Sequence, residues 1–153
     1  MREELCHMYT NVGIKKLDER AILPTYGSEY AAGADLYALT DAPVQIAPHQ
    51  TVFIHTGIAM ELPLGLVGLV YARSGLACKQ DLAPANKVGV IDCDYRGEIM
   101  VAVHNHGNEV KTVENGERIA QLVITPYITA HFEQKQSLSE TVRSDGGFGS
   151  TGK

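Results

Sequence analysis

The stretch that decides the fold class is ERIAQLVITPY, residues 117–127. Apolar residues, several of them β-branched, occupy both alternating sets of positions, which is typical of a strand that is buried on both faces. Gln121 is the exception, and strict alternation places it on the same face as Ile119 and Val123. We therefore expect a strand here that carries one polar amide among apolar neighbours.

Similar strand-like runs recur along the chain, separated by Gly, Pro, Asn and Asp, and no long segment has a helical period. Many short strands at this spacing predict an all-β fold, an antiparallel barrel or sandwich with little helix. The polar stretch EQKQSLSETVR predicts a connector to the C-terminal tail. The other strand-like runs are TVFIHTGIAMELP at 51–63, GLVGLVYA at 65–72, VGVI at 88–91 and EIMVAVHN at 98–105.

Length and charge are those of one soluble domain. A chain of 153 residues buries roughly two thirds of its extended surface when it folds alone. The net charge of −5 provides no basic field for nucleic acid, and no apolar run is long enough to predict a membrane span. Cys6, Cys78 and Cys93 are odd in number and lack metal-ligand spacing, which indicates a reducing compartment. We expect a cytoplasmic or nuclear protein without nucleic-acid or membrane partners.

Gln121 needs a hydrogen-bond partner. An amide on an apolar strand face costs stability unless its donors and its acceptor are paired. Either neighbouring backbone satisfies it or it is reserved for a ligand. The sequence leaves both interpretations open, and backbone is the commoner partner.

Two polar segments carry candidate binding groups. AAGADLYA, at 31–38, places Asp35 after small residues that let backbone pack around a carboxylate, although a lone aspartate is equally typical of a turn. YARSGLA, at 71–77, follows an apolar run with Arg73, Ser74 and Gly75. A guanidinium fork, a hydroxyl and bare backbone N–H groups together suit a phosphate, although such an arginine is more often a surface ion-pair partner.

The segment NKVGVIDCDYRGE, at 86–98, concentrates more polar groups than any other. A short strand ends at Ile91, and Asp92 and Asp94 follow it. Carboxylates at positions i and i+2 of an extended segment point the same way, which permits a metal pair. Equally, one aspartate is an ion-paired structural acid and the other does chemistry.

The tail RSDGGFGSTGK, at 143–153, matches most of a phosphate-binding P-loop. That motif also needs a strand before it and a helix after it, and neither pattern is present. What remains is a glycine-rich segment with one cation, Arg143, and one aromatic ring, Phe148. By itself it is typical of a frayed terminus.

Taken together, five segments resemble the five motifs of the homotrimeric dUTP pyrophosphatases (dUTPases) in order and in approximate spacing. They cover most of the chain, from 32 to 152. They are AGADLYA with Asp35, then RSGLA, GVIDCDYRGE, GERIAQLV and the tail GGFGSTG.

The resemblance implies a jelly-roll-like β fold, a homotrimer with active sites between subunits, and hydrolysis of dUTP to dUMP and pyrophosphate with Mg²⁺. Such an enzyme, a dUTP diphosphatase, limits uracil incorporation into DNA and supplies dUMP for thymidylate synthesis. It also implies that residues 1–142 form the β domain and that residues 143–153 form a flexible arm that closes over the site.

By the same resemblance, Asp92 activates the water that attacks the α-phosphate. Asp35 acts through waters of the metal or by fixing Arg73, and Mg²⁺ is held by the triphosphate and waters without a direct protein ligand. Asp94 takes a structural role, paired with Arg118. Gln121 then contacts the α-phosphate or its attacking water.

The remaining implied residues bind substrate. Asn86 and the backbone up to Ile91 read uracil, Tyr95 lies against the deoxyribose, and Phe148 stacks on the base. Ser144 stands where the family commonly has glycine, which stiffens the approach of the arm. The full implied binding set is Arg73, Ser74, Gly75, Asn86, Gly89, Val90, Ile91, Tyr95, Met100, Arg143, Phe148, Gly149, Ser150 and Thr151.

Three rival interpretations remain. dCTP deaminases share the fold, but they carry a glutamate on the strand after the aspartate turn, where this chain has MVAVHN with Ala102. A non-catalytic nucleotide-binding regulatory module predicts loss of Asp92, Gln121 or the tail, and all are present. A purely structural β-sandwich trimer gives no reason for Arg143 and Phe148 in a glycine-rich tail.

Overall fold

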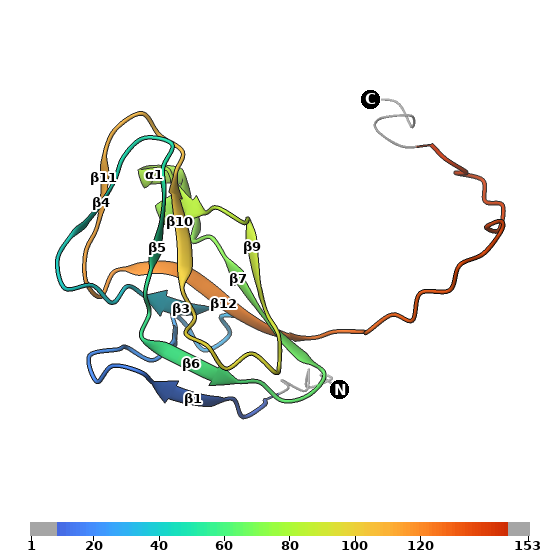
Figure 1. Ribbon diagram of the computed structural model, residues 1–153, viewed down its shortest axis with the longest axis horizontal. Coiled ribbons are helices and arrows are strands. Elements are labelled where there is room, and N and C mark those ends of the chain that lie inside the picture. Colours follow the sequence, from blue (N-terminus) through green and yellow to red (C-terminus); the bar gives the residue numbers. More distant parts are fainter. Residues whose placement is uncertain (1–8, 147–153) are drawn as a thin grey trace, which may run out of the picture.

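A computed structural model describes residues 9–146 and shows an almost entirely β protein (Figure 1). Short strands follow one another along this part of the chain, with a single helix between them, as the sequence predicts. In chain order the elements are β1 (Gly13–Lys16), β2 (Thr25–Tyr26), β3 (Ala34–Tyr37), β4 (Val44–Ile46), β5 (Thr51–Ile54), β6 (Ile58–Glu61), β7 (Leu66–Tyr71), α1 (Ser74–Gln80), β8 (Leu82–Pro84), β9 (Val88–Ile91), β10 (Val101–Asn105), β11 (Lys111–Val113) and β12 (Arg118–Pro126).

The strands form antiparallel sheets that enclose one hydrophobic core, and the fold is a β-sandwich. The largest sheet has the order β2-β3-β12-β7-β9, with β12 hydrogen-bonded to both β3 and β7. The second sheet has the order β5-β10-β8, and two smaller pairs, β1-β6 and β11-β4, complete the sandwich. Because β12 and β10 are central strands, the segments that carry the candidate site residues lie around a rigid frame.

Side-chain alternation along β10 is as the sequence predicts. Ile99, Val101 and Val103 are buried, whereas Met100 is exposed. Burial of an aliphatic side chain of this size contributes roughly 1.5–3 kcal/mol, so this face fixes the register of β10 against β5.

Strand β12 departs from strict alternation. The ladder with β3 pairs Arg118 with Tyr37 and then Ala120 with Leu36, which is the register shift of a β-bulge. Ile119 is fully buried in the core, so the expectation that it shares a face with Gln121 is wrong. The extra residue shifts the in-and-out alternation of side chains, so residues before and after the bulge that are an odd number of positions apart point to the same face.

The run at 51–63 forms two strands rather than one. β5 ends at Ile54 and β6 begins at Ile58, with Gly57 at a left-handed φ of 69° between them. A Cβ at Gly57 would lie 2.5 Å from Leu39 Cδ2, so both the backbone angle and the packing require glycine. The chain bends there and passes from one sheet to another.

The helix α1 is not apparent in the sequence. It starts directly after Arg73, buries Leu76 and ends at Asp81, which adopts the left-handed conformation. Seven residues make about two turns, too few for a helical period to stand out. Its consequence is that Ser74 and Gly75 occupy a first helical turn.

Beyond β12 the chain leaves the sandwich, as the orange to red trace shows in Figure 1. Residues 127–146 contain no helix or strand, which confirms the predicted connector at 133–143. Several apolar side chains there are exposed, including Ile128 and Phe132. Within residues 9–146, no helix is both long enough and apolar enough to cross a bilayer.

Candidate active site

A first cleft, which we call the arginine cleft, lies beside strands β3 and β12 and the start of α1. Its volume is about 240 Å³. It brings together five residues that the sequence singled out: Asp35, Arg73, Ser74, Gly75 and Gln121. The cleft is also lined by Gly27, Ser28, Ala31, Gly33 and Arg118.

Asp35 is the electrostatic centre of the arginine cleft. Its side chain is largely buried and accepts hydrogen bonds from two guanidinium groups, Arg73 Nε at 2.7 Å and Arg118 Nη1 at 3.3 Å. One carboxylate therefore faces two guanidiniums, and the trio carries one net positive charge. Such a group attracts an anion into the cleft.

The suggested pairing of Asp94 with Arg118 is wrong. Arg118 pairs with Asp35, and Asp94 lies on a different turn, in a separate cleft beside Glu61 and Arg96. The β-bulge explains the difference. Arg118 and Gln121 are an odd number of residues apart, so only the inserted residue lets both of them face Asp35.

Gln121 is partly satisfied by backbone. Its Nε2 donates to the Ala72 carbonyl at 2.8 Å. Its Oε1 lies over Gly33, where an added Cβ would be only 2.5 Å away. The structural and the ligand-binding interpretations thus both hold in part, because one N–H anchors the amide while the oxygen and the other N–H face the cleft.

Ser74 and Gly75 present backbone to the same cleft. They form the first turn of α1, whose N–H groups have no intrahelical acceptor. No side chain caps this helix start, and the space beside Gly75 is open. An anion in the cleft therefore meets unpaired N–H donors as well as Arg73.

A second cleft, which we call the hairpin cleft, lies between the tight turn that joins β8 to β9, the strand β9 and the segment 98–102. Its volume is about 260 Å³. It collects seven further predicted residues: Asn86, Gly89, Val90, Ile91, Asp92, Tyr95 and Met100. The sequence did not single out Phe53, which lies opposite Ala102 in the β5–β10 ladder and also lines this cleft.

The edge strand β9, which forms one wall of this cleft, presents backbone rather than side chains. β9 is the last strand of its sheet and is hydrogen-bonded to β7 alone, so alternate peptide groups point away from the sheet. Gly89 leaves this edge bare, and a Cβ there would lie 3.2 Å from Val70 Cβ. Lys87, at a φ of 63°, makes the tight turn beside Asn86.

The turn after β9 separates the two aspartates. Tyr95 N–H donates to the Asp92 carbonyl at 3.1 Å, which closes the chain into a turn. Asp92 is exposed in the hairpin cleft, and Asp94 lines the cleft on the other side. The chain turns here and the two carboxylates line different clefts, which disfavours a metal pair of these two residues.

The ring of Tyr95 is held in place. Its hydroxyl donates to the Glu98 carbonyl at 2.9 Å, and the ring folds over Gly97. A Cβ on Gly97 would overlap with the tyrosine oxygen and ring, so this ring position requires glycine at 97. The ring therefore forms a fixed wall of the hairpin cleft.

Glu98 is the glutamate nearest the position that a deaminase requires. It lines the hairpin cleft, but Gly57 N–H donates to its Oε1 at 2.8 Å and His55 Nδ1 lies 2.8 Å from its Oε2. Both carboxylate oxygens are therefore engaged by protein groups, which disfavours a proton-shuttle role for Glu98.

Cys93 and Tyr127 meet behind the aspartate turn. The Sγ and Oη atoms lie 3.9 Å apart, and the hydrogen bond with the thiol raises the pKa of Tyr127. This contact ties the start of the C-terminal segment to the turn that carries Asp92.

The two clefts do not meet within one chain. They have no lining residue in common. Val70, which lines the hairpin cleft, is buried opposite Leu122, so Gln121 beside it points to the other face of the sheet. In the strand register, Ile91 on β9 and Gln121 on β12 are separated by two strand spacings across the sheet and three residues along it. These spacings correspond to a distance of about 14 Å between their Cα atoms.

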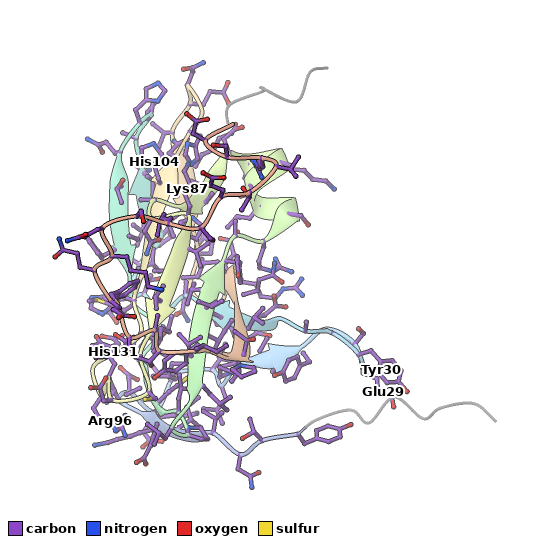
Figure 2. All side chains as sticks on the ribbon, turned by 90° about the vertical axis from the view of Figure 1, so that its right-hand side faces the viewer. Glu29, Tyr30, Lys87, Arg96, His104 and His131 are labelled. Carbon is purple, nitrogen blue, oxygen red and sulfur yellow. The ribbon has the colours of Figure 1, made fainter. Side chains whose placement is uncertain are left out.

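Figure 2 shows that the loop beside the arginine cleft and the aspartate turn lie at opposite edges of the molecule. Glu29 and Tyr30, in the loop beside the arginine cleft, project at one edge of the molecule, and Arg96, next to the aspartate turn, lies at the opposite edge.

The predicted arm is only partly described by the structure. Arg143 is exposed and donates from Nε to the Gly146 carbonyl at 2.9 Å, so it contacts neither cleft. Ser144, where the family commonly has glycine, adopts a left-handed φ of 48°. Phe148, Gly149, Ser150 and Thr151 lie outside the described residues. Among residues 9–146, no group of three His, Cys, Asp or Glu side chains is placed to hold a metal ion.

Known proteins are similar to this chain in sequence and in structure. The family model for dUTPase matches residues 19–152. A deoxyuridine 5'-triphosphate nucleotidohydrolase of Desulfitobacterium hafniense is 54% identical over 136 residues, 88% of this chain and 90% of the relative. The protein of that name from Syntrophotalea carbinolica is 46% identical over 141 residues, 92% and 96% of the two chains.

A solved structure agrees with the sequence relatives. The dUTPase of Staphylococcus bacteriophage 80alpha, in complex with dUPNHPP, superposes with a TM-score of 0.85 at 29% identity, over 94% of this chain and 99% of the phage chain. The family model and the relatives cover both clefts, and the chain belongs to the dUTPase family.

Proposed function

We propose that this protein hydrolyses dUTP to dUMP and pyrophosphate, and that a water activated by Asp92 attacks the α-phosphate. The observation that carries this proposal is the pair of clefts, one with a bare strand edge beside a carboxylate and the other with paired arginines. The first suits a nucleoside and the second suits a triphosphate. The sequence relatives named above act on deoxyuridine triphosphate, as their names state.

The edge of β9 reads the base. Its outward peptide groups offer donors and acceptors in fixed positions, and the Asn86 amide lies beside Gly89, with Nδ2 3.4 Å from the site of an added Cβ. Uracil pairs with such an edge. Cytosine presents an amine where uracil has a carbonyl, which leaves polar groups unpaired, and the methyl group of thymine adds bulk to a close wall.

Tyr95 selects the sugar. Its ring is fixed by the hydroxyl bond to the Glu98 carbonyl and by contact with Gly97, so it has little freedom to move aside. A deoxyribose packs flat against this wall, and a 2'-hydroxyl is excluded by contact. The protein therefore discriminates against UTP by shape.

Asp92 orients and deprotonates the attacking water. Its side chain is exposed and lines the hairpin cleft, so a water can reach the carboxylate. General-base assistance of this kind is typically worth about 10²–10⁴ in rate. The fixed turn places the carboxylate on the same side as the Tyr95 ring, where the α-phosphate follows the sugar.

The arginine cleft holds the phosphates through Arg73, the first-turn N–H groups of Ser74 and Gly75, and the free amide positions of Gln121. Asp35 also fits a role beside a hydrated Mg²⁺, because a carboxylate has about four lone-pair sites and two guanidiniums occupy only part of them. When bound, the ion neutralises negative charge on the triphosphate and on the leaving pyrophosphate.

A complete site requires more than one chain. The two clefts share no lining residue, and Ile91 and Gln121 are about 14 Å apart in one copy, which favours a site that combines clefts of two copies. A homotrimer that juxtaposes the hairpin cleft of one copy with the arginine cleft of another satisfies this geometry. The segment 127–146 leads away from its own sandwich, which supports residues 143–153 as an arm that closes over a shared site. We place this activity in the cytoplasm, where the thiols stay reduced.

The test is a substrate panel. Purified protein is incubated with dUTP, dCTP, dTTP or UTP in the presence of Mg²⁺, and pyrophosphate and ammonia are measured. Pyrophosphate from dUTP alone is the expected result. Ammonia from dCTP would assign a deaminase, and no product from any of the four would leave only nucleotide binding.

A further inference from the structure

We infer that Arg96 is a positioning residue for the reaction, which holds the turn that carries both Asp92 and Tyr95. The inference rests on the proposed function. It concerns a side chain that none of the substrate roles above uses.

The guanidinium of Arg96 binds backbone carbonyls of the turn. Its Nη1 donates to the Cys93 carbonyl at 2.7 Å and to the Tyr95 carbonyl at 3.0 Å. Its Nη2 contacts Glu61 Oε1 of β6 at 3.2 Å. One side chain thus ties two carbonyls of the turn to each other and to a strand of the sandwich.

Arg96 acts from behind the site. It lines the clefts that contain Glu61 and Asp94, and it does not line the hairpin cleft, where Asp92 and Tyr95 face the nucleotide. In Figure 2 it extends at the edge of the molecule. Within one copy it therefore reaches the nucleotide only through the turn that it holds.

The two residues that the turn presents have different tasks, which gives the inference a distinctive signature. Asp92 sets the rate of the chemical step, and Tyr95 sets the rejection of the 2'-hydroxyl. Two other contacts of this segment, Tyr95 N–H to the Asp92 carbonyl and the tyrosine hydroxyl to the Glu98 carbonyl, are internal to it, and the contact of Cys93 with Tyr127 is a long one, at 3.9 Å. Loss of Arg96 removes the bonds that hold the Cys93 and Tyr95 carbonyls together, so the turn loosens and the rate and the sugar selectivity change together.

The ion pair with Glu61 is not the main contribution. Both side chains are more than half exposed, and exposed pairs contribute little. The bonds to the two carbonyls satisfy backbone acceptors that the turn itself leaves unpaired. A lysine has the same charge but presents a single ammonium, so it does not bridge both carbonyls and Glu61.

The experiment compares Arg96→Ala, Arg96→Lys and Glu61→Gln with the parent protein. The matched control is Arg20→Ala, which removes another exposed arginine, paired with Asp18 and Asp41 away from both clefts. For each variant we measure kcat and KM for dUTP and the ratio of kcat/KM for dUTP to kcat/KM for UTP. We also measure how much activity returns in millimolar methylguanidinium. Circular dichroism and thermal unfolding confirm that each variant is folded.

For Arg96→Ala we expect kcat to fall about tenfold to a hundredfold, because small misplacements of reacting groups lower the rate by this much. We also expect a lower ratio of kcat/KM for dUTP to kcat/KM for UTP. Methylguanidinium should restore part of the activity. The kcat of Arg96→Lys should lie between those of Arg96→Ala and the parent protein. The kcat values of Glu61→Gln and Arg20→Ala should stay within about twofold of the parent value. Unchanged kcat and selectivity in Arg96→Ala would overturn the inference. So would a loss of activity with selectivity unchanged and no recovery, because that indicates general damage.

Failure of the proposed function is distinguishable from failure of this inference. Absence of dUTP turnover in the parent protein contradicts the function alone. A crystal structure of Arg96→Ala, or of Arg96→Lys if the alanine variant does not fold, then tests the inference without activity. Displaced Cys93 and Tyr95 carbonyls support it, and an unchanged turn overturns it.

Discussion

Asp35 on β3 and Gln121 on β12 lie directly opposite each other in the antiparallel ladder of the largest sheet. Side chains of opposed residues project to the same face, so the carboxylate and the amide share one cleft. Arg118 joins them only because a bulge interrupts the strand. This arrangement makes one face of the central strands polar, and it leads to several tests.

Asp92→Asn should keep the nucleotide pocket and lose the base. We expect kcat for dUTP to fall by about 10²–10⁴, because an amide does not accept a proton from water, while binding of a non-hydrolysable dUTP analogue stays within a few fold. Pyrophosphate release and calorimetric titration measure the two quantities. Full activity in this variant would remove Asp92 from the role of general base.

Asp35→Asn should destabilise the domain. The side chain is about one tenth exposed, and its loss of charge leaves Arg73 and Arg118 without a counterion. We expect the free energy of unfolding to fall by about 2 kcal/mol, less than for a fully buried pair because Arg118 is half exposed.

Urea denaturation measures this change, and Asp41→Asn is the matched control. Asp41 also pairs with an arginine, but its side chain is almost fully exposed, so we expect a change within about 0.5 kcal/mol. Equal effects at the two positions would show that the ion pairs of Asp35 contribute nothing specific.

Gly33→Ala should displace the Gln121 amide. The added Cβ would lie 2.5 Å from Oε1, so the side chain must rotate away and its bond to the Ala72 carbonyl is strained. We expect a fall in kcat/KM of roughly tenfold or more, in the range typical of a misaligned binding group.

Gly27→Ala is the comparison, because Gly27 lines the same cleft with open space where its Cβ would be. Steady-state kinetics with dUTP should show a change there within about twofold. If both alanines behave alike, the position of the Gln121 amide is not critical.

The outcome along β12 shows where prediction from sequence succeeds and where it stops. Val88–Ile91 forms a strand as expected, and the buried and exposed positions around Val101 follow strict alternation, because burial of alternate side chains is a local signal. The bulge at Ile119 is not local. It follows from packing against β3, and without it the proximity of Arg118 to Asp35 is not apparent.

The sequence predicts many of the residues that line the clefts, but it does not predict how the two clefts are placed relative to each other. The sequence motifs contain most of the polar residues of the arginine cleft and the hairpin cleft, but nothing in the sequence shows that the two groups line separate clefts. Phe53 was missed because it looks like an ordinary strand residue, and only its pairing with Ala102 brings it to the cleft. Helix α1 was missed because it is too short to show a period.

Removal of the tail tests the arm directly. A chain that ends at Val142 keeps every strand found within residues 9–146, so we expect its thermal unfolding to stay close to that of the full chain. Activity on dUTP should fall by at least about tenfold, because closure over the nucleotide is lost. Full turnover by the shortened chain would return residues 143–153 to the status of a frayed end.

The measurement that tests the shared site most directly is complementation between two inactive chains. Asp92→Asn and Gln121→Ala variants are each purified, then unfolded together in equal amounts and refolded, with each variant refolded alone as the control. If one copy supplies Asp92 and another supplies Gln121, random assembly restores about a quarter of the parental sites, and dUTP turnover rises to about that fraction. A mixture no more active than the two separate variants would contradict a site built from two chains.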